Sequence, residues 1–286
     1  MDEITVIHKA REFVAAVNPI AIPVDVSAYA SHLGAVIRRQ TDLGKNESGW
    51  SFENRGKYYI CVNAKDIGER QRFTVCHEIA HIVLGLPSDH KTLPSWSYAK
   101  KSREEILCDV FAAELLLPSK LFKPLADKEL ISFRTVGDLA DRFEASLTAT
   151  GSRFATVIGA PCAFVLSEKG NVRYTSRSLS LREANAWVHP RLGLPPGSVS
   201  ARARAGEVCE GPEEIGAELW FSPWERGGIL LEEARHFEQW DQTLTLLWFE
   251  DEEVPPLKSK QEEEEEEWGI KELDGILPWP GRKRRK

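Results

Sequence analysis

Apolar positions in the first half of the chain recur at two spacings. Apolar residues three or four positions apart predict amphipathic helices, and short runs of β-branched and aromatic residues between turn formers predict strands. An Asn-Arg-Gly turn at 54–56 separates two strand-like runs, which indicates a small antiparallel sheet. The pattern predicts helices over 3–17, 23–33 and 69–84, another helix from Ser102 that ends at Pro118, and strands over 34–40, 49–52 and 57–63.

The second half has a different pattern. Residues 136–154 predict two short helices around a tight turn at 144–146, as in a helix-turn-helix. Beyond Pro161, short apolar runs are interrupted by Gly and Pro, which is typical of strands in a separate, mainly β domain. These runs cover 163–166, 218–221 and 243–249.

Composition indicates where the protein works. No stretch approaches the roughly 18 uninterrupted apolar residues that cross a bilayer, and the opening Met1-Asp2-Glu3 has the wrong charge for a secretory signal. The five cysteines lie at irregular spacing without Cys-x-x-Cys pairs, which fits reduced thiols. We therefore expect a cytoplasmic protein with no membrane partner.

Charge is distributed unevenly. The net charge of −7 argues against general coating of nucleic acid. The last part of the chain has an acidic block at 262–267 and a basic end at 282–286, a composition that predicts a disordered tail over 251–286.

The segment His77-Glu78-Ile-Ala-His81 carries the clearest chemistry. Two histidines four positions apart lie about 40° apart around a helix, so both rings can reach one metal ion. Glu78 lies about 100° from His77 and need not bind the metal, so we expect it to act as the general base. The alternative is a pair of structural core histidines beside a surface glutamate.

Catalytic zinc needs three protein ligands and one open position, so a third ligand must come from elsewhere. Glu105 is the candidate, with Asp109 on the same helical face to accept a histidine N–H. Glu105 also fits a capping box that begins at Ser102, in which case Glu104 would replace it. Cys108 is a candidate inhibitory zinc ligand, or else a buried inert thiol. We expect one Zn²⁺ per chain.

Residues 73–81, Phe-Thr-Val-Cys-His-Glu-Ile-Ala-His, and 105–118, Glu-Ile-Leu-Cys-Asp-Val-Phe-Ala-Ala-Glu-Leu-Leu-Leu-Pro, resemble the ImmA/IrrE family of bacterial metallopeptidases. The resemblance is strong over about 45–120. The family's glutamate aligns with Glu105, which supports this residue as third ligand, whereas the family usually has Asn where this chain has Asp109.

The predicted fold class is α+β. It comprises a gluzincin-like zincin domain with a small antiparallel sheet over 1–124, a helix-turn-helix-like bridge over 125–157, and a C-terminal GAF-like α/β domain over 158–250. The order of these parts matches the longer IrrE-type members by resemblance.

Basic residues gather in the second half of the chain. Residues 151–205 carry eight Lys or Arg side chains against two Glu, interleaved with aromatic residues, a pattern typical of single-strand binding but equally of a solvated basic face over an aromatic core. In the helix-turn-helix, only Arg153 offers a basic contact, so structural bridging is the preferred interpretation. The candidate nucleic-acid contacts are Arg153, Arg173, Arg177, Arg182, Arg202 and Arg204.

The family's relatives cleave helix-turn-helix repressors, and CapP-like members serve CBASS antiphage defence operons and respond to single-stranded DNA. The resemblance therefore implies an endopeptidase that cleaves a partner repressor, with single-stranded DNA or another DNA-damage signal as activator. We also expect an extended substrate to add to an exposed sheet edge, with 57–63 as candidate strand or as an ordinary core strand. The alternative function is a non-catalytic, zinc-containing nucleic-acid-binding transcription regulator, against which Glu78 argues.

Overall fold

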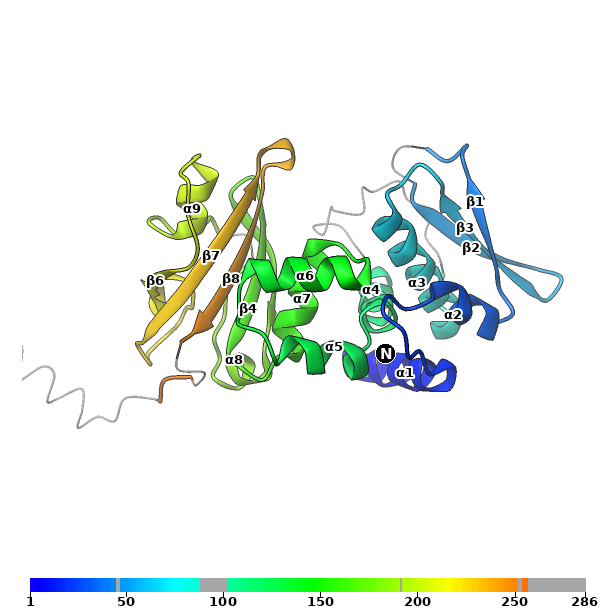
Figure 1. Ribbon diagram of the computed structural model, residues 1–286, viewed down its shortest axis with the longest axis horizontal. Helices are drawn as coiled ribbons and strands as arrows, with labels where there is room; N and C mark the ends of the chain where they lie inside the picture. Colours follow the sequence, from blue (N-terminus) through cyan, green and yellow to red (C-terminus); the bar gives the residue numbers. More distant parts are fainter. Residues whose placement is uncertain (45–46, 88–101, 191, 251–253, 257–286) are drawn as a thin grey trace, which may run out of the picture.

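The computed structural model describes residues 1–44, 47–87, 102–190, 192–250 and 254–256. Within these residues, a small sheet and its helices lie at one end, further helices occupy the middle, and a larger sheet lies at the other end (Figure 1). The predicted disorder of the tail falls on residues that lie outside the described part, apart from 254–256.

The chain begins with two capped helices, α1 (Glu3–Val17) and α2 (Val26–His32). Asp2 accepts a hydrogen bond from the Thr5 amide, and Asp25 accepts one from the Ser27 amide. Such caps satisfy amides that the first turn leaves without partners. Because Asp25 caps α2, the helix begins later than the predicted 23–33.

The small sheet contains β1 (Val36–Gln40), β2 (Gly49–Asn54) and β3 (Lys57–Asn63) in the order β1-β3-β2. The prediction of a purely antiparallel sheet was wrong. The tight turn makes β2 and β3 antiparallel, but the connection 41–48 is long enough to place β1 at the far side of β3, where it runs parallel. Of the two alternatives for 57–63, the exposed edge strand is wrong and the core strand is confirmed, because β3 lies in the centre of the sheet.

Helix α3 (Gly68–Leu84) packs against this sheet, and α4 (Arg103–Leu116) packs against α3 on the side of the middle helices (Figure 1). Gly85 ends α3 in the left-handed region at φ 65°, as a C-terminal glycine commonly does. Ser102 caps α4 by accepting from the Glu105 amide. Both helices match the predicted spans closely.

The middle of the molecule contains α5 (Ser119–Ala126), α6 (Phe133–Phe143) and α7 (Leu147–Val157). Glu144 ends α6 with a left-handed φ of 49°, and Ser146 caps α7. The predicted pair of short helices around a tight turn is confirmed.

The larger sheet has the order β5-β4-β8-β7-β6, and all its neighbours are antiparallel. Short helices α8 (Leu179–Glu183) and α9 (Val199–Arg204) accompany it. The strands are β4 (Cys162–Glu168), β5 (Asn171–Arg177), β6 (Glu213–Gly216), β7 (Ile229–Phe237) and β8 (Gln242–Phe249).

One predicted strand run, 218–221, is wrong. It forms a 3₁₀ turn (Ala217–Leu219) followed by two buried aromatic side chains. Trp220 donates its indole N–H to the buried carboxylate of Glu232, 3.0 Å away. A buried aromatic run therefore fills the core without joining the sheet, which local sequence cannot distinguish from a strand.

One apolar core extends from α1 through the bridge helices to one face of the larger sheet. Phe154 of α7 and Phe164 of β4 both belong to it, and Gly151 approaches the Phe164 ring so closely that a Cβ there would lie 2.4 Å from it. A second core covers the sheet's other face. The bridge is thus packed against both neighbouring parts.

Among the helices of the described residues, none is both long and apolar enough to cross a membrane.

Candidate metal centre

His77 and His81 lie on one face of α3, with their Nε2 atoms 3.1 Å apart. The Nδ1 atom of His81 is 3.3 Å from the Leu86 carbonyl, to which a protonated Nδ1 donates. Gly85 turns the chain so that Leu86 lies back over the end of the helix. This contact leaves the Nε2 atom of His81 as the one that faces the site.

Glu105 reaches the same point from the first turn of α4. Its Oε2 atom lies 3.1 Å from His77 Nε2, and its Oε1 atom lies 3.4 Å from His81 Nε2. On the next turn, Asp109 places Oδ1 3.0 Å from His77 Nδ1. Asp109 therefore lies beside the ring nitrogen of His77 that is not directed toward Glu105 and His81.

These separations fit a tetrahedral zinc site. With Zn–N and Zn–O bonds of about 2.0–2.1 Å, two ligands of a tetrahedral ion are about 3.3 Å apart. The contacts among His77, His81 and Glu105 span 3.1–3.4 Å. Two imidazoles and one carboxylate are also a donor set of a catalytic zinc site that keeps an open position.

The electrostatics of the cluster favour a cation. Burial opposes a charge on His77, but hydrogen bonds with Asp109 and Glu105 raise its pKa to about 10. Burial likewise opposes a charge on Glu105, yet hydrogen bonds from His77 and His81 hold its pKa below the usual range. The same acidic surroundings that favour a proton on His77 also favour a bound divalent cation.

Glu78 lies beside the histidines and is 3% exposed. One potential ligand atom from each of His77, Glu78 and His81 lies within 4.8 Å of the others. Ser51 of β2 donates a 2.7 Å hydrogen bond to Glu78 Oε2. The sequence gives no sign of Ser51, because no residue type or spacing marks a contact between positions 27 apart.

The sequence left three further possibilities open on α4: a cap at Ser102, Glu104 as a substitute ligand and Cys108 as an inhibitory ligand. Ser102 caps the helix through the Glu105 amide, while the Glu105 carboxylate contacts the histidines. Glu104 is exposed, and hydrogen bonds with its own amide and with Ser102 lower its pKa. Cys108 is fully buried within the main apolar core.

Arg153 does not present its charge to solvent. It donates to Glu114 Oε2 at 2.5 Å and to the Leu117 carbonyl at 2.9 Å, and its side chain is 11% exposed. This position favours the bridging interpretation of the helix pair over nucleic-acid contact.

The other candidate arginines surround the larger sheet. Arg177 stacks on Trp187 with 4.1 Å between the guanidinium carbon and the ring centre, and Trp187 is 49% exposed. Arg182 is exposed. Three others form ion pairs within the chain: Arg173 with Glu168, Arg202 with Glu213, and Arg204 with Asp241.

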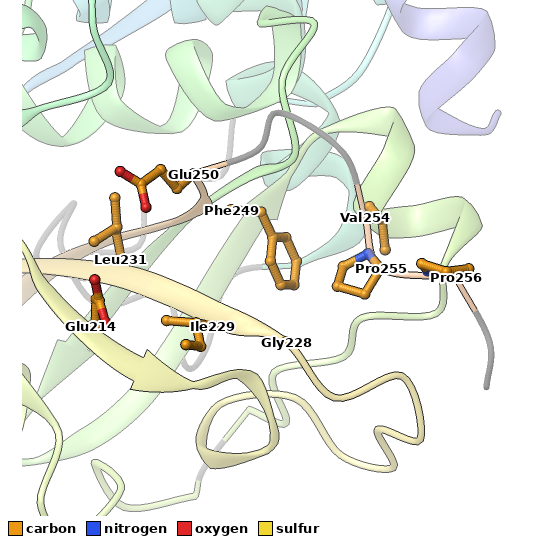
Figure 2. A pocket seen from close by; sticks show the side chains of 9 residues that line it. All are labelled: Glu214, Gly228, Ile229, Leu231, Phe249, Glu250, Val254, Pro255 and Pro256. Atoms are coloured by element: carbon orange, nitrogen blue, oxygen red, sulfur yellow. The ribbon is translucent and has the colours of Figure 1, made fainter. Parts of the chain in front are cut away.

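A cavity of about 420 Å³ lies beside β6, the beginning of β7 and the end of β8 (Figure 2). Its lining includes the acidic residues Glu214 and Glu250 and the apolar residues Phe249 and Pro255. Its lining includes none of the candidate site residues and no histidine or cysteine. The cavity is therefore separate from the candidate metal centre.

The α3–α4 pair carries two histidines and a glutamate, a donor set that is found in catalytic zinc sites. Residues 30–155 match the family described as the IrrE N-terminal-like domain. This match, together with two relatives, supports an ImmA/IrrE-type family for this region.

Two relatives are each named radiation response metalloprotease IrrE. The protein from Deinococcus deserti is 29% identical over 164 residues, which is 54% of this chain and 57% of the relative. The protein from Deinococcus radiodurans is 31% identical over 93 residues, which is 32% of this chain and 28% of the relative. The matches thus span little more than half of the first relative and less of the second.

A solved structure named Mycobacterium tuberculosis transcriptional regulator has a similar fold. Its TM-score is 0.58 at 13% identity, over 87% of this chain and 76% of that chain. At this identity, the likeness concerns the fold alone.

Proposed function

We propose that the chain is a zinc-dependent endopeptidase with His77, His81 and Glu105 as zinc ligands and Glu78 as general base. One observation carries the proposal: the Nε2 atoms of His77 and His81 and the two carboxylate oxygens of Glu105 meet through contacts of 3.1–3.4 Å, beside the almost fully buried carboxylate of Glu78. A structural zinc site needs no such carboxylate.

The residues divide the chemistry among them. Bound Zn²⁺ would polarise a peptide carbonyl and acidify a water ligand. Glu78 takes the proton from the attacking water and returns it to the leaving amine. Asp109 keeps His77 in the ligand tautomer, as the Leu86 carbonyl does for His81.

Strand β2 offers a place for the substrate backbone. The Asn63 amide donates to the Ser48 carbonyl, so backbone groups at even positions of β2 face β3, whereas those of Gly49, Ser51 and Glu53 face away. In the described part of the chain, β2 is an outer strand of its sheet. An extended peptide that pairs with this edge would lie beside Glu78.

The proposed substrate is a helix-turn-helix transcriptional repressor, whose cleavage derepresses a stress or antiphage defence operon in the cytoplasm. The family match and the radiation response named for two relatives support a regulated protease of this kind. A CapP-like role in a CBASS operon rests on the resemblance of the two motif blocks.

We assign residues 1–124 to the peptidase, 125–157 to the bridge and 158–250 to a GAF-like sensor that responds to single-stranded DNA or another damage signal. The exposed Trp187 with its stacked Arg177, near the exposed Arg182, supports an aromatic and basic binding surface. One continuous apolar core connects this sensor with the bridge and the peptidase.

A zinc-containing, non-catalytic nucleic-acid-binding regulator is the second candidate. The same arginine and tryptophan surface favours it. It leaves the buried Glu78 without a role.

The test incubates the zinc-loaded protein and its Glu78→Gln variant with the helix-turn-helix protein encoded beside it, with and without single-stranded DNA. Mass spectrometry then detects fragments. Cleavage by the unmodified protein alone, and only with DNA, is the expected result. Cleavage without DNA removes the sensor proposal, and no cleavage with zinc bound favours the regulator.

A further inference from the structure

We propose that Ser51 is a positioning residue that holds the Glu78 carboxylate in its reactive orientation. This inference rests on the proposed peptidase function. The side chain of Ser51 does not touch the reacting atoms, so Ser51 acts on the reaction through Glu78.

The contact is direct and short. Ser51 Oγ donates to Glu78 Oε2 at 2.7 Å, which is the length expected for a hydroxyl bound to a carboxylate. Glu78 is 3% exposed, so this bond lies largely out of water and is stronger than a surface bond.

The strand alternation explains why Ser51 reaches α3. Successive side chains of a strand point to opposite faces. Trp50 and Phe52 therefore share the other face of β2, where their rings stack with centroids 4.8 Å apart. Ser51 is left to face Glu78.

The approach of β2 to α3 is also unusually close. A Cβ at Gly49 would lie 2.5 Å from Thr74 Cγ2 on α3 and 2.4 Å from the Cys61 carbonyl oxygen. Only glycine permits this approach, and the approach brings a side chain as short as serine within reach of Glu78.

Ser51 therefore connects two parts of the proposed site. Its backbone faces the outer edge of β2, where an extended substrate would pair, and its hydroxyl holds the general base. Orientation of a reacting group lowers the barrier without changing the affinity for substrate. Loss of the hydroxyl should thus lower kcat and leave KM unchanged.

The experiment compares the zinc-loaded full chain with Ser51→Ala, Ser51→Thr and Ser48→Ala. Thr keeps the hydroxyl and suits a strand. Ser48 is the matched control, because its Oγ accepts from Arg70 and does not contact Glu78. Zinc content and melting temperature are measured for each variant, and kcat and KM are measured on the substrate of the cleavage test.

Ser51→Ala should lower kcat between about 10- and 100-fold at unchanged KM and zinc content. Ser51→Thr should restore kcat, and Ser48→Ala should match the unmodified protein. An unchanged kcat in Ser51→Ala, or a Ser51→Thr variant as slow as Ser51→Ala, would overturn the inference.

A second readout separates this inference from the proposed function. Acetohydroxamate chelates zinc through both oxygens and places its hydroxyl against a neighbouring carboxylate, so calorimetry reports Glu78 placement without any cleavage. Weaker binding to Ser51→Ala than to Ser48→Ala supports the inference even where no substrate is cleaved. Equal binding to both variants, or no binding to the unmodified zinc-loaded protein, overturns it.

Discussion

Arg153 of α7 donates a 2.5 Å hydrogen bond to the buried carboxylate of Glu114 on α4, and this pair joins the bridge to the helix that carries Glu105. Ser119 completes the network, because its amide and hydroxyl both donate to Glu114. A change in the packing of α7 would therefore act directly on α4.

Replacement of Arg153 by Met should lower the free energy of unfolding by about 3 kcal/mol, because it removes a charged partner of a buried carboxylate. Urea unfolding followed by circular dichroism measures the change. Arg134→Met is the control, since Arg134 is exposed on the neighbouring α6. An Arg153→Met variant as stable as this control would show that the pair is not needed for stability.

Zinc should stabilise the unmodified protein but not His81→Ala. A ligand at 100 times its dissociation constant raises the stability of the folded state by about 2.7 kcal/mol. Differential scanning calorimetry with added zinc, then with a chelator, tests this expectation. An equal melting-temperature shift in His81→Ala would place the metal elsewhere.

The Glu78→Gln variant should keep its zinc and lose cleavage. General base catalysis contributes about 10²- to 10⁴-fold, and Gln keeps the size of the side chain without its basicity. Elemental analysis of the metal and initial cleavage rates measure the two effects independently. A rate within tenfold of the unmodified protein would assign the base to another residue.

The sequence predicted the parts of the site that lie within one helix turn of each other. His77 and His81 follow from their spacing, and Glu105 follows from the need for a third ligand, although its pattern also fitted a cap. In the structure the two roles are compatible, since the cap uses the Glu105 amide and the cluster uses its carboxylate. Ser51 could not be predicted, because its contact depends on how closely β2 passes α3.

Local sequence patterns also did not predict how distant elements are arranged. The turn at 54–56 indicates a hairpin but not the position of β1, which depends on where the preceding connection leads. The positive charge counted over 151–205 took no account of partners, and Arg153 and Arg204 are paired with acidic residues from distant elements. Charge counts along a chain predict a binding surface only when the charges share one face.

Asp109→Ala should weaken zinc binding by about 10- to 100-fold, since it removes the acceptor that holds the His77 tautomer. Asp109→Asn should bind zinc within a few-fold of the unmodified protein, because the amide oxygen can accept the same N–H. Competition with a fluorescent zinc chelator measures both affinities. Equal affinities for Asp109→Ala and for the exposed-residue control Glu104→Gln would contradict the role given to Asp109.

Gly49→Ala should destabilise the protein by about 1–3 kcal/mol, the usual effect of an added methyl group in a packed interior. The new Cβ would lie 2.4 Å from the Cys61 carbonyl oxygen, a backbone atom, so β2 or its neighbour must shift. Gly137→Ala is the matched control, because its Cβ would meet nothing within 4 Å on helix α6, where alanine is preferred by roughly 0.5–1 kcal/mol. Thermal unfolding measures both variants.

If β2 moves away from α3, the Ser51–Glu78 contact lengthens, so Gly49→Ala should also lose cleavage activity below its melting temperature, whereas Gly137→Ala should retain it. A Gly49→Ala variant with full activity and stability would show that the close approach of β2 is not required.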